Sequence, residues 1–158
     1  MSDVETGGCQ CGAVRYAIER TAILTLYCCH CRECQRQSAS GFGMSMKVSR
    51  GGFRVEQGRL SLWERRTDRG SITRMHFCPN CGVRICHDSG ADSAMVSLKA
   101  GSLDDTGWLR PVGHIWAKRA QKWLALAPNL LIYDAQPESY DALIGAYRAQ
   151  TAAEKSAT

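Results

Sequence analysis

The stretch Cys28-Cys29-His30-Cys31-Arg32-Glu33-Cys34 constrains the fold more than any other part of the chain. It packs four thiols and one imidazole into seven residues, a density that neither a hydrophobic core nor a surface loop requires. Two cysteine pairs flank it, Cys9-Gln10-Cys11 upstream and Cys78-Pro79-Asn80-Cys81 downstream. Such short spacings favour metal binding in a reducing compartment. The chain is therefore expected to fold around metal–thiolate centres.

A disulfide framework is the alternative interpretation of the nine cysteines. Disulfides are typical of secreted chains, whereas the segment Met1 to Gly8 is polar and slightly acidic, unlike a secretory or organelle-targeting peptide. No apolar run reaches the length that crosses a membrane. We therefore expect a soluble, cytoplasmic protein with metal-bound thiols and no membrane partner.

The formal net charge of +5 is a second feature to explain, because a basic excess can indicate nucleic-acid binding. Ligating thiols are deprotonated, so seven thiolates and two Zn²⁺ ions would lower this charge to about +2. The basic residues, among them Arg65, Arg66, Lys118 and Arg119, are dispersed and form neither a concentrated stripe nor a recognised module. No nucleic-acid partner is expected.

Hydrophobic alternation and turn residues predict a mainly β domain. The length of 158 residues favours one domain with a hydrophobic core, and Gly-rich turns separate short segments with the period of strands. A helix is expected from Pro137, where the missing N–H is harmless, followed by a frayed tail from Ala149. The apolar stripe of this helix consists of Tyr140, Leu143, Ile144 and Tyr147. The expected strands are Ala13–Ile18, Ala22–Tyr27, Phe42–Val48, Phe53–Glu56, Leu60–Arg66, Ser71–Phe77, Val83–His87, Ala94–Lys99, Val112–Ala117 and Leu130–Tyr133.

The outer cysteine pairs, Cys9/Cys11 and Cys78/Cys81, match the needs of a closed zinc site. A tetrahedral Cys₄ site uses two thiolate pairs, each bent by a short turn. Such a site has no position for a substrate, and its metal contributes folding free energy directly.

The central stretch is then left with an odd number of ligands. Cys29, Cys31 and Cys34 supply three thiolates and leave a fourth position open, as in catalytic zinc sites. An external thiol would ionise at that position, or the metal would polarise a carbonyl. Spacing alone leaves other registers open, because Cys28, Cys31 and Cys34 form an equally regular series and His30 would complete a closed Cys₃His site. Two purely structural zinc ions are the alternative.

Several motifs, taken together, resemble the glutathione-dependent formaldehyde-activating enzyme family. They are Gly8-Cys9-Gln10-Cys11-Gly12-Ala13-Val14-Arg15-Tyr16, Cys29-His30-Cys31-Arg32-Glu33-Cys34 with Gln35-Arg36, Phe77-Cys78-Pro79-Asn80-Cys81-Gly82, Gly101-Ser102-Leu103-Asp104-Asp105, and His114-Ile115-Trp116-Ala117 with Trp123. The likeness covers about residues 5–135, which are predicted to form the zinc-binding domain, with a C-terminal helix and polar tail over 136–158. It implies the mainly β fold of the Mss4-like proteins, with a zinc-binding β-sheet, short loops and turns, and one C-terminal helix.

The same resemblance implies ligand sets and a reaction. A structural zinc would be bound by Cys9, Cys11, Cys78 and Cys81. A catalytic zinc would be bound by Cys29, Cys31 and Cys34, and this second site could be partly empty. Cys28 and Cys86 would be buried non-ligands. The implied activity is that of a carbon–sulfur lyase-type enzyme, which adds glutathione or a similar thiol to formaldehyde or another small aldehyde.

Two other functions are alternatives to this enzyme. A non-enzymatic Mss4-like zinc module that binds a protein partner would use the same cysteines. Methionine sulfoxide reduction shares the kind of fold, but it requires a redox cysteine in a strand context that the sequence does not offer. A small-molecule thiol and an aldehyde are thus the expected partners.

Other polar and aromatic residues were assigned more general roles. No histidine is singled out as a general acid: His76 and His87 are interpreted as strand residues, and His30 as a residue that shapes the loop between two ligands. Arg32 and Arg36 flank the thiolates, where guanidinium groups would offset negative charge and attract the carboxylates of glutathione; a solvated surface is the alternative. The remaining candidates, interpreted as core residues rather than pocket walls, are Trp108, Trp116 and Trp123.

Overall fold

A computed structural model describes residues 3–67 and 70–156. The chain divides into two compact units. The first unit comprises Met1–Ile23 and Lys47–Trp108, and the second comprises Leu24–Met46 and Leu109–Thr158. The predicted division into residues 5–135 and 136–158 stays a prediction.

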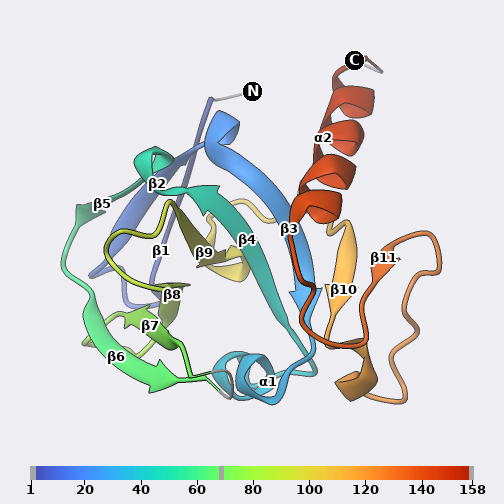
Figure 1. Ribbon diagram of the computed structural model, residues 1–158. Coiled ribbons are helices and arrows are strands. Elements are labelled where there is room, and N and C mark those ends of the chain that lie inside the picture. Colours follow the sequence, from blue (N-terminus) through green and yellow to red (C-terminus); the bar gives the residue numbers. More distant parts are fainter. Residues whose placement is uncertain (1–2, 68–69, 157–158) are drawn as a thin grey trace. The chain divides into compact units, whose positions relative to one another are not determined.

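One sheet of the first unit contains three antiparallel strands in the order β1-β2-β5 (Figure 1). These are β1 (Val4–Gly8), β2 (Arg15–Glu19) and β5 (Phe53–Gln57). Strand β1 was not predicted, because its sequence contains more polar and glycine residues than apolar ones. Pairing with β2 over its whole length provides the hydrogen bonds that its side chains do not predict.

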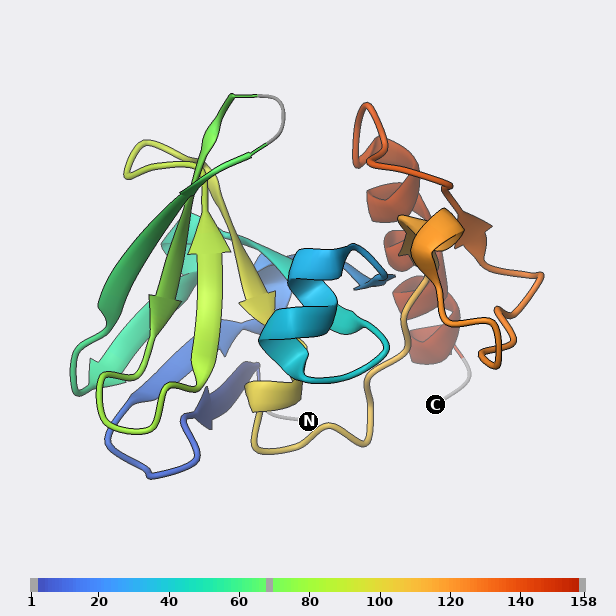
Figure 2. The same cartoon turned by 90° about the horizontal axis from the view of Figure 1, so that it is seen from below.

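Four further strands of the first unit run antiparallel in sequence order (Figure 2). They are β6 (Ser61–Arg66), β7 (Ile72–Phe77), β8 (Arg84–Asp88) and β9 (Met95–Lys99). The strands β8 and β9 carry most of the buried residues of this set, among them Ile85, Cys86, Val96 and Leu98. All four strands were predicted, each within two residues of its observed ends.

The second unit has a different strand arrangement, with two parallel pairs. Strand β10 (Gly113–Ile115) pairs in parallel with both β3 (Ile23–Cys29) and β11 (Leu131–Ile132). Strand β4 (Gly43–Ser49) is the other neighbour of β3. Parallel strands need long connections, so residues distant in sequence are brought beside the cysteine-rich end of β3.

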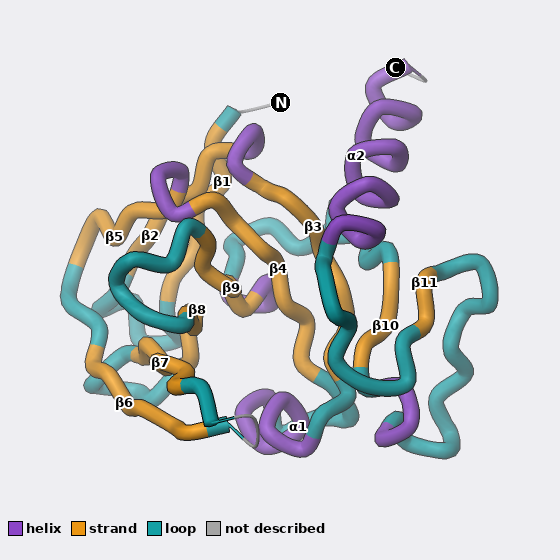
Figure 3. Tube along the Cα trace, viewed as in Figure 1, coloured by secondary structure: helices purple, strands orange, loops and turns teal. Residues whose placement is uncertain are grey.

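Two α-helices belong to the second unit (Figure 3). They are α1 (Arg32–Ser38) and α2 (Asp141–Ser156). The start predicted at Pro137 is wrong, because the Ser139 hydroxyl accepts a hydrogen bond from the Asp141 N–H at 2.9 Å and α2 begins only there. The fraying expected from Ala149 is also wrong as far as Ser156, where α2 ends, because this segment is rich in alanine, glutamate and lysine, which are strong helix formers. The last two residues of the predicted tail lie outside the described residues.

Short 3₁₀ turns connect several strands. They span Arg20–Ala22, Arg50–Gly52, Ala100–Ser102 and Ala117–Arg119. The prediction of a mainly β fold with one long C-terminal helix is confirmed. Within the described residues, no helix combines the length and the apolar character that a membrane span needs.

Helix α2 packs on the second unit through a small number of close contacts. Leu143 is fully buried, and its carbonyl accepts a hydrogen bond from the Thr25 hydroxyl at 2.9 Å. Gly113 lies so close to this helix that an added Cβ would lie 2.6 Å from Leu143 Cδ2 and 2.7 Å from the Leu131 carbonyl oxygen. The absence of a side chain at Gly113 therefore permits the packing.

This contact predicts opposite effects for two glycine substitutions. Gly113→Ala should lower the free energy of unfolding by about 1–3 kcal/mol, because the backbone oxygen of Leu131 cannot move aside easily. Gly145→Ala, within α2, should raise it by about 1 kcal/mol, since nothing lies within 4 Å of the added methyl and alanine favours the helix. Urea unfolding of both variants tests this pair. A stabilising Gly113→Ala would contradict the packing of β10.

Candidate metal centres

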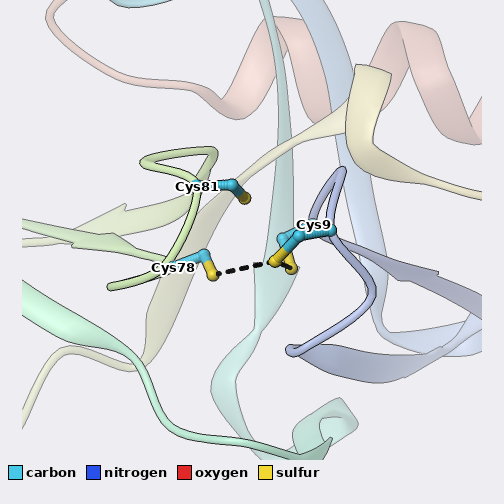
Figure 4. Close-up of side chains that lie close together, drawn as sticks. Cys9, Cys78 and Cys81 are labelled. Atoms are coloured by element: carbon cyan, nitrogen blue, oxygen red, sulfur yellow. Dashed lines mark hydrogen bonds between the residues drawn. The ribbon is translucent and has the colours of Figure 1, made fainter.

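Four thiols of the first unit converge on one point. The sulfurs of Cys9, Cys11, Cys78 and Cys81 lie within 4.8 Å of one another, with Sγ–Sγ distances of 3.5 Å from Cys9 to Cys11 and 3.8 Å from Cys11 to Cys78. Figure 4 shows the side chains of Cys9, Cys78 and Cys81 directed toward one another. Tetrahedral zinc with Zn–S bonds of about 2.3 Å requires sulfurs about 3.8 Å apart. The cluster therefore has dimensions that fit a zinc ion.

The two cysteine pairs have the same backbone hydrogen bonding despite their different spacing. The Cys9 N–H donates to the Val14 carbonyl at 3.1 Å, and the Cys78 N–H donates to the Val83 carbonyl at 3.0 Å. Each bond closes a loop around its pair, and each loop leads directly toward a strand. Two similar knuckles thus present two thiols each.

A glycine with positive φ follows the second cysteine of each knuckle. Gly12 has φ +77° and Gly82 has φ +75°, a conformation that L side chains rarely adopt. This turn directs backbone N–H groups back at the sulfurs, as in the bond from the Val14 N–H to Cys9 Sγ at 3.2 Å. The glycines adjacent to the cysteines are therefore part of the site.

The thiols of this cluster share their protons unequally. Burial raises the pKa of Cys9, but the Val14 N–H and the neighbouring thiols outweigh burial and lower it to about 6. The Ala13 N–H lowers the pKa of Cys11, but contact with Cys9 and the other thiols raises it to about 12. Without a cation, only part of the cluster can ionise at neutral pH. A bound cation would remove this limit.

Three thiols of the second unit form a separate cluster. The sulfurs of Cys29, Cys31 and Cys34 lie within 4.8 Å of one another. Cys29 ends β3, Cys31 is the N-cap of α1, and Cys34 lies in the first turn, where its N–H donates to Cys31 Sγ at 3.4 Å. Cys28 is buried outside both clusters, because successive strand residues point to opposite faces. The structure thus brings the sulfurs of Cys29, Cys31 and Cys34 together without Cys28, and that these three are the metal ligands stays a prediction.

Crowding in this cluster also separates the pKa values of its members. Hydrogen bonds from the Cys29 and Cys34 thiols lower the pKa of Cys31 to about 2, and the same contacts raise the pKa of Cys29 well above its usual range. Cys31 is half-buried, whereas Cys29 and Cys34 are buried. One thiolate is therefore favoured over three until a cation binds. All nine cysteines of the chain are free thiols.

His30 lies between two of these thiols in sequence but is directed elsewhere. Its fully buried ring places Nε2 at 2.9 Å from Nδ1 of His114. Burial and the nearby His114 lower the pKa of His30, so this buried pair is favoured in its neutral form. His30 is not among the residues that could share a metal with the cysteines.

No sequence pattern indicated the contact between His30 and His114. It arises from the parallel pairing of β10 with β3, in which the His30 N–H donates to the Ile115 carbonyl at 3.0 Å. The interpretation of His76 and His87 as strand residues agrees with their positions in β7 and β8.

A cleft of about 580 Å³ lies beside α1. Its walls include residues of α1, of the loop after it, and of the stretch after residue 119. Trp123 lines it and is 74% exposed, so its interpretation as a core residue is wrong. Trp108 and Trp116 are half-buried. The residues that line the cleft include Arg32, Gln35, Arg36, Ser40, Gln121 and Trp123.

Together, the fold and the two thiol clusters define a β-rich protein with a four-thiol and a three-thiol centre, either of which could hold a metal ion. The family model of the glutathione-dependent formaldehyde-activating enzymes matches residues 4–119, and the chain belongs to this family. A crystal structure of a Rhodobacter sphaeroides protein is similar in fold, with a TM-score of 0.51 and 21% identity. That match covers 65% of this chain and 91% of the other.

Cys28 and Cys29 point to opposite faces of β3, and this difference provides a test of the three-thiol centre. Cys29→Ala should remove one metal ion per chain, because only two thiols would remain in the cluster. Cys28→Ala is the matched control and should retain the full metal content. Native mass spectrometry of the purified proteins measures both. Loss of metal from Cys28→Ala alone would contradict the ligand set.

Proposed function

We propose that the chain is a zinc-dependent carbon–sulfur lyase-type enzyme that joins glutathione or a similar thiol to formaldehyde or another small aldehyde. The thiol loses its proton, its sulfur forms a bond to the carbonyl carbon as the C=O π bond opens, and the carbonyl oxygen gains a proton, so that the thiol and the aldehyde give an S-hydroxyalkyl product. Membership of the family supports this reaction. It fits a reducing, cytoplasmic setting, where thiols stay free.

The observation that carries the proposal is the difference in sulfur number between the two clusters. Cys9, Cys11, Cys78 and Cys81 are enough to saturate a tetrahedral zinc, which would be structural. The other cluster has three sulfurs, and three protein ligands leave one position for an exogenous group. When bound there, zinc would lower the pKa of a thiol ligand and polarise a carbonyl oxygen.

The chain's own residues supply a suitable setting for this chemistry. Cys31 is only half-buried, so the cluster is accessible on one side. Three thiolates around a divalent cation carry one net negative charge, and Arg32 brings positive charge to the same helix, in which Arg36 is paired with Glu33. Buried His30 and His114 hold the loop between Cys29 and Cys31 to β10. A rigid loop keeps the thiols in their relative positions.

Two cysteine substitutions should separate the structural role from the catalytic role. Cys81→Ala should unfold the protein or lower its melting temperature strongly, because a structural zinc contributes folding free energy. Cys31→Ala should retain the fold, lose one zinc ion and lose S-hydroxymethylglutathione formation. Circular dichroism, metal analysis and NMR detection of the product from ¹³C-formaldehyde and glutathione measure the three quantities.

The outcomes distinguish the enzyme from a protein-binding zinc module. If Cys31→Ala unfolds as readily as Cys81→Ala, the three-thiol cluster is structural and the proposed reaction is contradicted. Cys86→Ala is the control, because Cys86 is buried in β8 outside both clusters. It should retain both zinc ions and product formation.

A further inference from the structure

The cleft beside α1 contains a guanidinium group that is held in place but not neutralised. Arg32 Nη1 donates to Gln35 Oε1 at 3.0 Å. Among residues 3–67 and 70–156, no carboxylate forms an ion pair with Arg32. Arg36, by contrast, pairs with Glu33 at 3.0 Å. Since a guanidinium has five N–H donors, Arg32 has donors left for an anionic ligand.

Gln35 fixes the position of Arg32 through a complete set of hydrogen bonds. Its Nε2 donates to the carbonyls of His30 at 2.7 Å and Arg119 at 3.0 Å. Its Oε1 accepts from Arg32 at 3.0 Å and from Gln121 Nε2 at 3.4 Å. A carboxamide has two N–H donors and two acceptor lone pairs, so every one is used. The buried Gln35 thus links the cleft to the carbonyl between Cys29 and Cys31.

Trp123 contributes an apolar, planar surface to the lining of the cleft. Trp123 Cζ2 and Gln121 Cγ approach Gly41 so closely that an added Cβ there would lie 3.5 Å and 3.3 Å away. One edge of the indole is therefore held by the loop, while most of the ring is exposed. A flat surface of this kind suits a peptide group or an aliphatic chain. The volume of about 580 Å³ lies in the range of small-molecule sites.

We propose that this cleft recognises the carboxylate-bearing part of the thiol substrate, with Arg32 as the anion-binding residue, Trp123 as the apolar wall and Gln35 as the positioning residue. This inference rests on the proposed function, and it assigns the selection of the thiol to these residues. Arg32 and Gln35 directly follow Cys31 and Cys34, and adjacent Cα atoms are 3.8 Å apart. A ligand the size of a tripeptide can therefore contact Arg32 and reach the cluster. The cleft favours a peptide thiol with a free carboxylate over a small uncharged thiol.

A binding experiment on the zinc-loaded protein tests the cleft without turnover. S-methylglutathione carries carboxylates but no free thiol, and its diethyl ester lacks the carboxylate charge. Calorimetry should show that Arg32→Gln weakens binding of the acid by about tenfold, the lower end for a charge-assisted hydrogen bond, while acid and ester bind this variant equally. Trp123→Ala should weaken both probes to the same extent. Arg148→Gln, an exposed charge removal on α2, should retain the preference for the acid.

Enzyme turnover provides a second measurement, the preference between two thiols, which would not change if Arg32 had a purely structural role. The ratio of kcat/KM for glutathione to kcat/KM for 2-mercaptoethanol should fall about tenfold in Arg32→Gln, with the melting temperature unchanged. The cleft proposal would be overturned if Arg32→Gln left this ratio of kcat/KM values unchanged. It would also be overturned if Arg32→Gln preferred the acid over the ester as strongly as the wild type does. Neither result would contradict the proposed reaction. Absence of turnover with any thiol, alongside Arg32-dependent binding of the acid, would overturn the reaction but support the carboxylate site.

Discussion

Electrostatic repulsion among clustered thiolates is the constraint on which the first unit depends. Cys9 and Cys11 belong to the N-terminal knuckle, and Cys78 and Cys81 to a knuckle almost seventy residues later, as in the Cys11–Cys78 contact across 67 positions. Their sulfurs lie within 4.8 Å, a distance at which several negative charges cannot coexist without a cation. Backbone N–H groups help to lower the pKa of Cys9 and of Cys81, whereas contact with the other thiols raises the pKa of Cys11. Metal binding and the joining of the two knuckles are therefore expected to be one event.

The same constraint acts differently in the second unit because its three sulfurs come from one short segment. Cys29, Cys31 and Cys34 are brought together by the end of a strand and the first turn of a helix. Local geometry positions them, so losing a metal there need not separate distant parts of the chain. This difference in sequence separation is consistent with the proposed structural role of the four-thiol site and the proposed exchange of an external ligand at the three-thiol site.

Local signals were enough to predict most of the strands and to mark the cysteine-rich segments. Alternation and turn glycines indicated β6 to β9. Spacing marked the cysteine motifs but could not choose between Cys28 and Cys29, and the resemblance to the family made that choice. Local signals could not predict contacts made by the fold. Strand β1 is formed by pairing with β2, and His30 meets His114 because β10 pairs in parallel with β3 across 84 positions. Trp123 was misassigned because residue type indicates a preference for burial, not the position of a loop.

The choice of an amide at Gln35 has a consequence for how the second unit functions. A carboxylate could accept from Arg32 but could not donate to the carbonyls of His30 and Arg119, so it would hold the guanidinium and release the loop. An apolar residue would leave the buried carbonyl of His30 and the part-buried carbonyl of Arg119 with fewer donors, at a cost of about 1–3 kcal/mol for a buried unsatisfied group. Only the amide serves both sides. The group that orients the proposed anion-binding residue is thus also the group that holds the backbone between two thiols, so selection of a thiol and geometry of the cluster depend on one side chain.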